Sequence, residues 1–366
     1  MEQWEKQNTR SLYETAFPED SNAFVDYYYQ WKTRDNEILV MEGNSSVKDG
    51  FFQVMIHLNP YKIWMNGRQE RIPYLVAVAA DPGCRRQGKM GQVMRHLLRD
   101  LEQRKMPFTF LLPADPAYYQ GQGFVFFPYM DLTGIQKEEQ GMVKAANAPF
   151  SYGKEKRGFK WKEAAEGDIP AMVEFSNEIL MKRHDLVISR DGYYYKRLLE
   201  ETKVEHGGIL LLLHSGVLCG MLTFAVNDAG NIQPEDGCRA EIKELLLDEY
   251  ISEEDGLNIS QEALKEAGIT GNAVSRLVFP FEQMMVRITS LTETVPLLKS
   301  RTRRTFQVKV RDSVIEANNG CYRIILDWDG GRIFRISEEE ATIELDISRL
   351  TEELWKDVSV YLNEWV

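Results

Sequence analysis

Apolar residues at the start of the chain first follow helical spacing and then form strand-like runs. Phe24, Tyr27, Tyr28 and Trp31 recur at i, i+3, i+4 and i+7, which predicts a helix that Ser21 can cap. Strands are predicted over residues 37–42, 51–58, 62–65, 68–72 and 74–80. The first third of the chain is therefore predicted to hold helices followed by a twisted sheet.

A tight hairpin and a loop before a helix complete this first part. Asn66-Gly67 favours the positive φ values of a type I′ turn, so the strands on its two sides are predicted to pair. The buried run 74–80 leads through a glycine-containing loop into a helix, and strand 108–112 follows Pro107. One face of that helix carries Met90, Val93, Met94, Leu97, Leu98 and Leu101.

The middle of the chain repeats this order after a polar stretch, residues 137–157, which is predicted to be a linker. Predicted elements are a helix opening at Asp168 and Pro170, a helix over 192–201, a hairpin over 207–226 turning near Ser215-Gly216, and a strand over 240–247. The strand runs into "DEYISEEDG", residues 248–256, whose carboxylates would repel a phosphate. Any second copy of a phosphate site has therefore been lost here.

From about Arg276 the pattern changes to short strands with tight turns. Strands are predicted over 283–288, 305–312, 321–328, 332–337 and 341–347. A closing helix is predicted from about Thr351, with an apolar stripe of Leu354, Val358, Tyr361, Leu362 and Trp365. Because that stripe continues to Trp365, the end of the chain is expected to be packed.

The charge balance narrows the class of partner. Lys and Arg total 44 against 56 Asp and Glu, a formal net charge of -12, which disfavours nucleic acid and favours a cationic small molecule. The one basic run, 299–311, alternates like a solvated strand face. Four scattered cysteines, no signal peptide and no apolar run long enough to span a bilayer predict a cytoplasmic protein without membrane or metal partners.

The loop "GCRRQGKM", residues 83–90, fits seven of the eight positions of a Walker A phosphate loop. The eighth position needs a hydroxyl to ligate Mg²⁺, and Met90 offers only a thioether, which is a poor ligand for a hard cation. Glycine and a helix N-terminus still suit a phosphate, because backbone N–H groups point toward the anion. The alternatives are a nucleoside triphosphate site, another phosphate site and a merely solvated helix start.

The loop, with the strand before it, resembles the coenzyme A loop of the GNAT superfamily of N-acetyltransferases, x-x-P-x-x-R-x-x-G-x-[GA]. Pro82, Arg85 and Gly88 stand in register, and Met90 takes the last small position with Gly91 after it. A bulky apolar residue at that position is similar to the enhanced intracellular survival (Eis) branch of the superfamily. "ADPAYYQGQGF", residues 114–124, resembles the second signature, a tyrosine before a glycine-aromatic pair.

The Eis resemblance covers the whole chain and implies an α/β (α+β) fold in three parts. It implies an N-terminal GNAT acetyltransferase domain over 1–150, a degenerate GNAT-like mixed-sheet domain over 151–275, and a sterol-carrier-protein-like α+β domain over 276–366. The family also implies a homo-oligomer, a hexamer by habit.

Acetyl-CoA, with no metal, is the co-substrate that the resemblance implies. Cofactor contacts fall on Val78, Ala79, Ala80, Arg85, Arg86, Gln87, Gly88, Lys89, Met90, Gly91, Ala114 and Asp115. Tyr119 falls at the position of the general acid, which would protonate a departing thiolate whose conjugate acid has a pKa near ~8.5. Tyr118 is the alternative acid, and both tyrosines could instead be packing residues.

The same resemblance places the general base on the carboxylate of Val366, the chain terminus, although chain termini are often frayed. The substrate pocket would take Glu19, Tyr28, Trp31 and Glu364, where carboxylates and aromatic rings favour a cation. Each of these four residues could equally be surface charge or core packing.

These features together predict an acetyl-CoA-dependent N-acetyltransferase. It would transfer an acetyl group to a primary amine of a cationic acceptor, aminoglycoside-like, polyamine or lysine, by direct attack in a ternary complex. Two alternatives stay open. One is an acyl-CoA-sensing carrier that uses the C-terminal domain for an apolar ligand, and the other is a protein or peptide acetyltransferase with an open groove.

Overall fold

The computed structural model describes residues 5–43, 52–128, 143–144, 159–227, 239–251, 276–277 and 284–364. The chain divides into two compact units. Unit 1 comprises Met1–Met130, His184–Ser189 and Glu282–Val366, and unit 2 comprises Asp131–Arg183 and Arg190–Phe281. Unit 1 is therefore assembled from three separate stretches of sequence.

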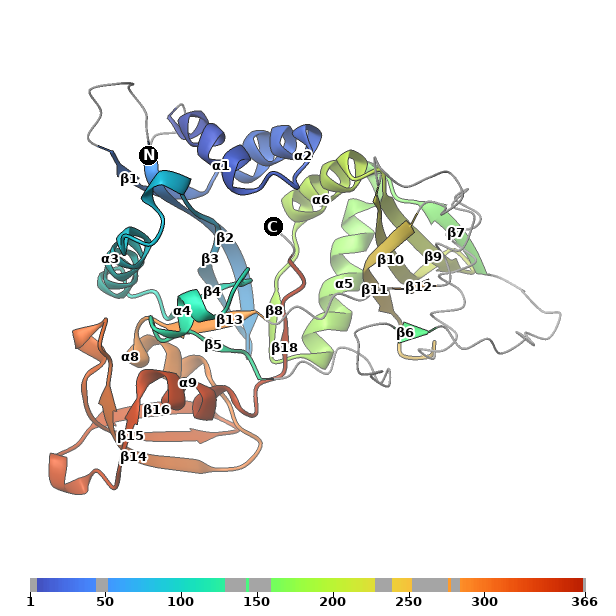
Figure 1. Cartoon of the computed structure of the whole chain (residues 1–366). Helices are drawn as coiled ribbons and strands as arrows, with labels where there is room; N and C mark the ends of the chain where they lie inside the picture. The colour runs from blue at the N-terminus through green and yellow to red at the C-terminus, as the bar shows by residue number, and fades with distance from the viewer. Residues whose placement is uncertain are drawn as a thin grey trace. The chain divides into compact units, whose positions relative to one another are not determined.

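The main sheet of unit 1 is mixed (Figure 1). Its strands in the described residues are β1 (Glu37–Glu42), β2 (Phe52–Met65), β3 (Arg68–Ala80), β4 (Phe108–Leu111), β5 (Val125–Phe126), β8 (Leu186–Ile188), β13 (Met285–Ile288) and β18 (Val360–Tyr361). Their order is β18-β8-β2-β3-β4-β13-β5, with β1 on β2. The pairs β3–β4 and β8–β18 are parallel, and the other pairs are antiparallel.

The predicted hairpin is confirmed, and its strands are longer than predicted. Asn66 and Gly67 have φ values of 51° and 88° at the turn between β2 and β3. The predicted strands 51–58 and 62–65 form the single strand β2. Pro60 lies opposite Pro73. The Pro73 carbonyl faces β4, where it accepts a hydrogen bond from the Thr109 hydroxyl at 2.7 Å. The proline pair therefore lies at a position where β2 and β3 exchange no backbone hydrogen bond, and the missing N–H groups do not interrupt the hairpin.

The first stretch of unit 1 contributes helical segments, some of which lie on the two faces of β2. The segments of this stretch are η1 (Lys6–Thr9), α1 (Arg10–Ala16), α2 (Asn22–Tyr27), the π-helical turn η2 (Tyr28–Lys32), η3 (Pro82–Cys84), α3 (Lys89–Gln103) and α4 (Ala117–Gln120). Alternate residues Val54, Ile56 and Leu58 share one core with α3, whereas His57 contacts Tyr28 on the opposite face. Ser21 caps α2 as predicted, accepting a hydrogen bond from the Phe24 N–H at 3.1 Å.

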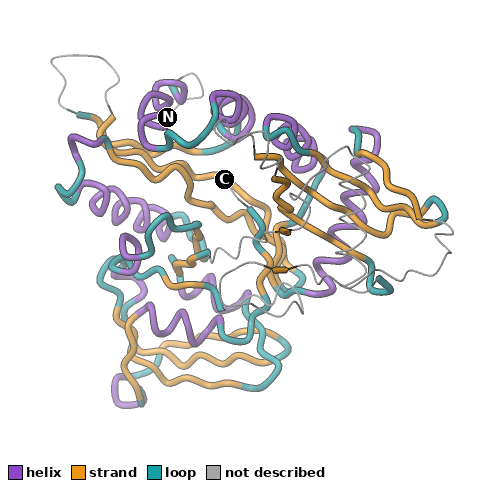
Figure 2. The backbone as a smooth tube through the Cα atoms, turned by 45° about the vertical axis from the view of Figure 1, so that its right-hand side comes forward, coloured by secondary structure: helices purple, strands orange, loops and turns teal. Residues whose placement is uncertain are grey.

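A second sheet of unit 1 has the order β16-β15-β14-β17. The elements of this part are α8 (Leu291–Thr294), η7 (Val295–Leu297), β14 (Arg304–Arg311), η8 (Glu316–Asn318), β15 (Gly320–Asp327), β16 (Gly330–Arg335), η9 (Glu338–Glu340), β17 (Ile343–Asp346) and α9 (Ile347–Trp355). Helix α9 lies beside this sheet in both views (Figures 1 and 2).

The predicted closing helix is wrong in position and extent. Helix α9 begins after Asp346, whose side chain accepts a hydrogen bond from the Arg349 N–H, and it ends at Trp355. The apolar residues beyond it belong to an extended segment that contains β18. Val358, Val360 and Leu362 are buried at every second position, which is the period of a strand.

The described residues of unit 2 form the helices α5 and α6, a four-stranded antiparallel sheet and the strand pair β6–β12. Its elements are β6 (Val143–Lys144), β7 (Phe159–Glu163), η4 (Glu166–Asp168), α5 (Ile169–Arg183), α6 (Gly192–Val204), β9 (Gly208–His214), β10 (Val217–Asn227), β11 (Arg239–Leu247) and β12 (Arg276–Leu277). The two predicted helices and the hairpin are confirmed, with Ser215 and Gly216 at φ 53° and 85°. Apart from β6, the predicted linker 137–157 lies outside the described residues.

The predicted fold class is confirmed, because each unit combines helices with a sheet and the main sheet is mixed. None of the helices in the described ranges is long and apolar enough to cross a bilayer. The three-part division at 150 and 275 stays a prediction.

Candidate active site

Strands β3 and β4 separate at one point in the main sheet. Their parallel pairing is confined to Tyr74 with Phe110 and Leu75 with Leu111. Immediately afterwards β3 carries a bulge, where the register against β2 shifts by one residue and Ala77 has a φ of 47°. Residues 76–80 of β3 are therefore paired with β2 on one edge and have no β4 partner on the other. The predicted cofactor residues Val78, Ala79 and Ala80 lie in this stretch.

The loop between β3 and α3 points backbone donors outward. Asp81 begins it by accepting a hydrogen bond from the Gly83 N–H at 2.8 Å, and Arg86 and Gly88 adopt positive φ values of 59° and 73°. Within the described part of the chain, the backbone N–H groups of residues 86–91 donate to no other residue. Such a row of N–H groups at a helix N-terminus is a site for an anion.

Side chains of the loop divide between solvent and core. Arg85, Arg86 and Gln87 are exposed, and the Arg85 Nε–H donates to the Ala80 carbonyl at 3.3 Å. Met90, by contrast, packs against the core between α3 and the sheet. The residue that departs from both phosphate-loop patterns is therefore an apolar anchor for the start of α3. A side chain in place of Gly91 would lie 3.3 Å from Arg95 and 3.6 Å from Gln122.

The adjacent tyrosines of α4 have opposite environments. Tyr118 is 73% exposed, whereas Tyr119 is 7% exposed and packs edge-to-face against Phe124. Burial, with a smaller contribution from Tyr118, raises the pKa of Tyr119 to about 12. Its hydroxyl makes no hydrogen bond within the part of the chain that the structure describes. Tyr119 is thus a protonated donor at neutral pH, although its role as the acid stays a prediction.

The other predicted cofactor residues, Ala114 and Asp115, lie in the exposed loop before α4. Asp115 Oδ1 accepts a hydrogen bond from the Ala117 N–H at 2.9 Å and so shapes the start of α4.

The three predicted substrate residues near the first helices differ in solvent exposure. Glu19 is exposed between α1 and α2, and Trp31 is half-buried with the Arg34 guanidinium 4.3 Å from its ring centre. Tyr28 is fully buried, and its hydroxyl lies 3.0 Å from His57 Nδ1. Burial lowers the pKa of His57 to about 3, with the Lys6 charge adding to the effect. Tyr28 is a core residue here, and its substrate role stays a prediction.

The predicted substrate residue Glu364 is buried and contacts side chains of β2 and β3. Its Oε2 accepts a hydrogen bond from the Tyr61 hydroxyl at 2.5 Å, and its carbonyl accepts one from Tyr74 at 3.5 Å. Its Oε1 is buried without a partner among the described residues. Tyr74 is also the residue at which β3 still pairs with β4. Glu364 therefore contacts the side chains of Tyr61 in β2 and Tyr74 in β3, and Val366 lies outside the described residues.

Residues 1–127 match the acetyltransferase (GNAT) domain in a comparison with protein families. This stretch contains β3 with its bulge, the loop of N–H donors, α3 and Tyr119. Residues 1–127 are a GNAT acetyltransferase domain. The protein is accordingly an N-acetyltransferase.

Solved structures share the fold of the whole N-acetyltransferase chain at low sequence identity. A protein of unknown function from Enterococcus faecalis V583, assigned as a probable N-acyltransferase, has a TM-score of 0.70 at 14% identity, covering 96% of this chain and 87% of its own. A GCN5-related N-acetyltransferase from Anabaena variabilis has a TM-score of 0.66 at 12% identity, with 100% and 97% covered. Eis1 from Mycobacterium abscessus has a TM-score of 0.63 at 11% identity, with 97% and 88% covered. No curated protein sequence matches the chain significantly.

Two charged residues of the acetyltransferase escaped the sequence analysis. Arg287 and Asp312 are buried in unit 1 and bonded to each other, and Arg287 also binds the turn that follows Tyr119. The available signal was an arginine inside the apolar run "QMMVRI", because a charge in a buried strand requires a partner.

Proposed function

We propose that this acetyltransferase transfers the acetyl group of acetyl-CoA to a primary amine of a small cationic acceptor, by direct attack in a ternary complex. The observation that carries the proposal is the coincidence of three features at one end of β3: the unpaired edge of residues 76–80, the row of N–H donors from Arg86 to Gly91, and the buried Tyr119.

The loop suits a diphosphate without a metal ligand. Six consecutive N–H groups and the exposed Arg85 and Arg86 supply donors and positive charge, and Gly88 adopts the left-handed conformation that lets the backbone turn toward the anion. Met90, whose position would need a hydroxyl in a magnesium–triphosphate site, faces the core. These residues fit the pyrophosphate of coenzyme A, and the free edge of β3 at Val78 and Ala80 fits its amide-containing arm.

Transfer of the acetyl group requires a polarised thioester carbonyl and a proton for the departing sulfur. N–H groups on the unpaired edge of β3 can donate to the carbonyl oxygen as negative charge develops on it. Tyr119, with a pKa raised to about 12, stays protonated and can act only as the acid. Because a thiol has a pKa near ~8.5, Tyr119 can deliver its proton only as charge builds on the sulfur in a site closed to water.

Two observations support a cationic amine as the acceptor: the buried carboxylate of Glu364 and the formal net charge of -12. A buried carboxylate oxygen without a partner is costly unless a cation completes it, so Glu364 Oε1 suits an ammonium group. Two residues further on, the Val366 carboxylate would receive the proton that the amine loses. Glu19, Tyr28 and Trp31 remain the other proposed substrate residues.

The finer assignments belong to the same proposal. They are the Eis type, the division at residues 150 and 275, a sterol-carrier-like C-terminal part, a cytoplasmic location and a homo-oligomer, a hexamer by resemblance. The purely carrying alternative is not favoured, because an acetyltransferase domain forms the front of the chain.

The test is release of free thiol from acetyl-CoA across a panel of polyamines, aminoglycosides and lysine peptides. Turnover with small polycations is expected, with one acetyl group transferred per thiol released. Turnover with lysine peptides alone would favour a protein acetyltransferase, and no turnover with any amine would refute the proposal.

A further inference from the structure

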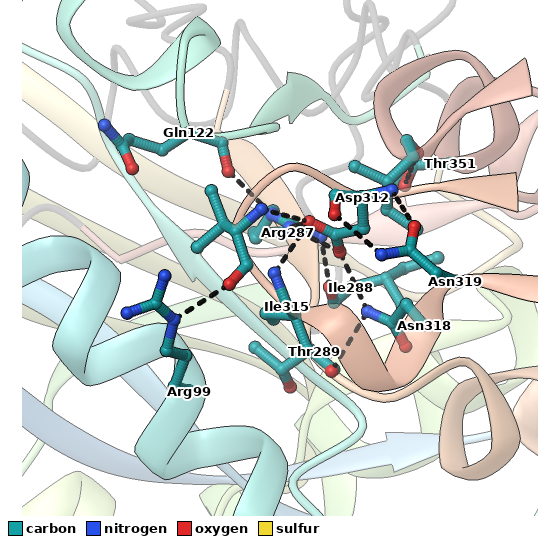
Figure 3. A network of polar contacts seen from close by, with 12 residues as sticks. Arg99, Gln122, Arg287, Ile288, Thr289, Asp312, Ile315, Asn318, Asn319 and Thr351 are labelled. Atoms are coloured by element: carbon teal, nitrogen blue, oxygen red, sulfur yellow. Dashed lines mark hydrogen bonds and ion pairs between the residues drawn. The ribbon is translucent and has the colours of Figure 1, made fainter.

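A fully buried ion pair contacts the turn of residues 119–123, which is called the acid turn below because it carries Tyr119 (Figure 3). Arg287 of β13 and Asp312, which follows β14, both have side chains with no solvent exposure. Arg287 Nη2 donates to both carboxylate oxygens of Asp312 at 2.7 Å. Each charge is costly to bury alone, so the two depend on each other.

Arg287 uses its other donors on backbone carbonyls. Its Nε–H donates to the Gln122 carbonyl at 2.7 Å, and its Nη1 donates to the carbonyl of Ile288 at 2.5 Å. The Gln122 N–H in turn donates to the Tyr119 carbonyl at 2.9 Å. Arg287 is therefore bonded to Gln122, the residue whose own N–H closes the turn after Tyr119.

Gly123 allows this approach of the guanidinium to the backbone. It has a φ of +86°, and a Cβ at this position would lie 2.8 Å from Arg287 Nε. The "GQGF" end of the tyrosine motif is thus shaped to receive an arginine from a strand that lies far later in the sequence.

Asp312 also connects to the helix that follows the loop of N–H donors. Its Oδ1 accepts hydrogen bonds from the N–H groups of Val314 and Ile315 at 2.9 and 3.0 Å. The Val314 carbonyl accepts a hydrogen bond from Arg99 of α3 at 3.0 Å (Figure 3). Val314 and Ile315 also share one apolar core with Tyr119 and with the buried face of α3. The turn 312–315 therefore contacts both α3 and, through Arg287, the acid turn.

The pair is ionised in the folded protein. Burial alone would raise the pKa of the Asp312 carboxyl, but the Arg287 charge and the hydrogen bonds from Arg287, Asn318 and Ile315 hold it below its usual range. Burial lowers the pKa of the Arg287 guanidinium, and the Asp312 charge opposes this effect. A guanidinium starts from so high a pKa that it stays charged near neutral pH.

We propose that Arg287 and Asp312 are positioning residues for Tyr119, which set the acid turn at a fixed place relative to α3. The proposal rests on the proposed function, because it assigns Tyr119 the acid role. Both residues lie beyond 1–127, so the acetyltransferase domain as matched lacks the group that orients its own acid.

The test replaces the pair by apolar residues of similar size, Arg287→Met with Asp312→Leu, since such a replacement often leaves stability unchanged. Turnover should fall about 10- to 100-fold as the acid turn shifts. The dissociation constant for acetyl-CoA should stay within about 3-fold, because no residue of the loop or of α3 is replaced. The same change in a Tyr119→Phe background should lower turnover by less than about 2-fold, because the acid it positions is absent.

A matched control is the buried pair of unit 2, Arg190 and Glu244, in which two guanidinium nitrogens donate to the two carboxylate oxygens. Arg190→Met with Glu244→Leu should leave turnover within about 2-fold of the wild-type value. If the Arg287 and Asp312 double variant does not fold, Arg287→Lys keeps the charge pair but cannot also reach Gln122, and it should show the same loss.

Three results are distinguishable. Wild-type enzyme without turnover on any amine would refute the proposed function. A folded double variant with wild-type turnover, or an equal loss with and without Tyr119, would show that the pair is only structural. A loss confined to enzymes that carry Tyr119 supports positioning.

Discussion

The two units share an order of helices and strands, and the proposed site lies in unit 1. In unit 1, α1 and α2 precede the antiparallel strands β1, β2 and β3, and in unit 2, α5 and α6 precede β9, β10 and β11. In both units the third strand has one extra residue opposite the second, at Ala77 near the end of β3 and at Lys243 in the middle of β11. The bulge alone therefore does not make a binding site.

What differs is the chain that leaves the third strand. After β3 come Arg85, Arg86 and a row of N–H groups without partners, whereas Asp248 and Glu249 follow β11. The Asp248 N–H is also bonded, to the Cys219 carbonyl at 2.9 Å. Among the described residues, charge sign and the availability of backbone donors distinguish the proposed binding loop of unit 1 from its counterpart in unit 2.

The largest contrast between the units should come from their buried tyrosines. Tyr119→Phe should lower turnover by about 10²- to 10⁴-fold, since it removes the proton donor, and leave acetyl-CoA affinity nearly unchanged. Tyr195→Phe in unit 2 should have little effect. Steady-state kinetics with thiol detection and a binding titration measure both quantities. Equal losses of turnover and affinity would make Tyr119 structural, and a large loss in Tyr118→Phe instead would transfer the role to that residue.

A smaller effect is expected at the end of the chain. One alanine added after Val366 moves the terminal carboxylate, so turnover should fall on the order of 10²-fold if that group is the base. The comparison is made with Val366→Leu, which keeps the carboxylate in place. An extended enzyme with unchanged turnover would remove the terminus from the mechanism.

Removal of the charges after β3 and after β11 tests whether charge sign distinguishes the two units. Arg85→Ala with Arg86→Ala should weaken acetyl-CoA binding by about 10-fold or more, because charge-assisted hydrogen bonds to phosphate are lost. Asp248→Ala with Glu249→Ala should leave both affinity and the number of acetyl-CoA sites per chain unchanged. Calorimetric titration reports both values, and a second site in the unit 2 variant would show that repulsion alone keeps that unit empty.

The smallest effect concerns stability and pH. The pKa of His57 is about 3 in the folded protein and near ~6.5 when unfolded, so the unfolded state binds the extra proton as pH falls below ~6.5. This group should cost the wild type about 2 kcal/mol of unfolding free energy between pH 7 and pH 5. His57→Gln should lack this term, and His96→Gln on the exposed face of α3 should retain it. Denaturant unfolding of the wild type and both variants at pH 7 and pH 5 measures this difference in unfolding free energy.

The sequence predicted what depends on neighbouring residues. The Asn66-Gly67 hairpin, the apolar face of α3 and the order helices–hairpin–strand in unit 2 follow from local turn chemistry and periodicity. The predicted closing helix is wrong because the apolar residues 358–362 fit a helical stripe in the sequence, although their burial alternates as in a strand. The helix instead begins after its cap, Asp346.

Long-range pairing could not be predicted from the same signals. Strand β13 enters the main sheet between β4 and β5, and β8 and β18 extend its other side, although no local pattern joins these segments. The bond from Arg287 to Gln122 spans 165 positions of sequence for the same reason. The charged residue itself was visible, but its partners were not.

The central claim is that the loop from Arg86 to Gly91 holds the diphosphate of coenzyme A through its backbone, without a metal. The most direct measurement is calorimetric titration of the full-length protein with acetyl-CoA in the presence of a chelator, and separately with ATP and Mg²⁺. One acetyl-CoA site per chain, insensitive to the chelator and weakened by about 10-fold or more in the Arg85 and Arg86 double variant, is the predicted result. Binding of ATP that requires Mg²⁺, with no binding of acetyl-CoA, would contradict it.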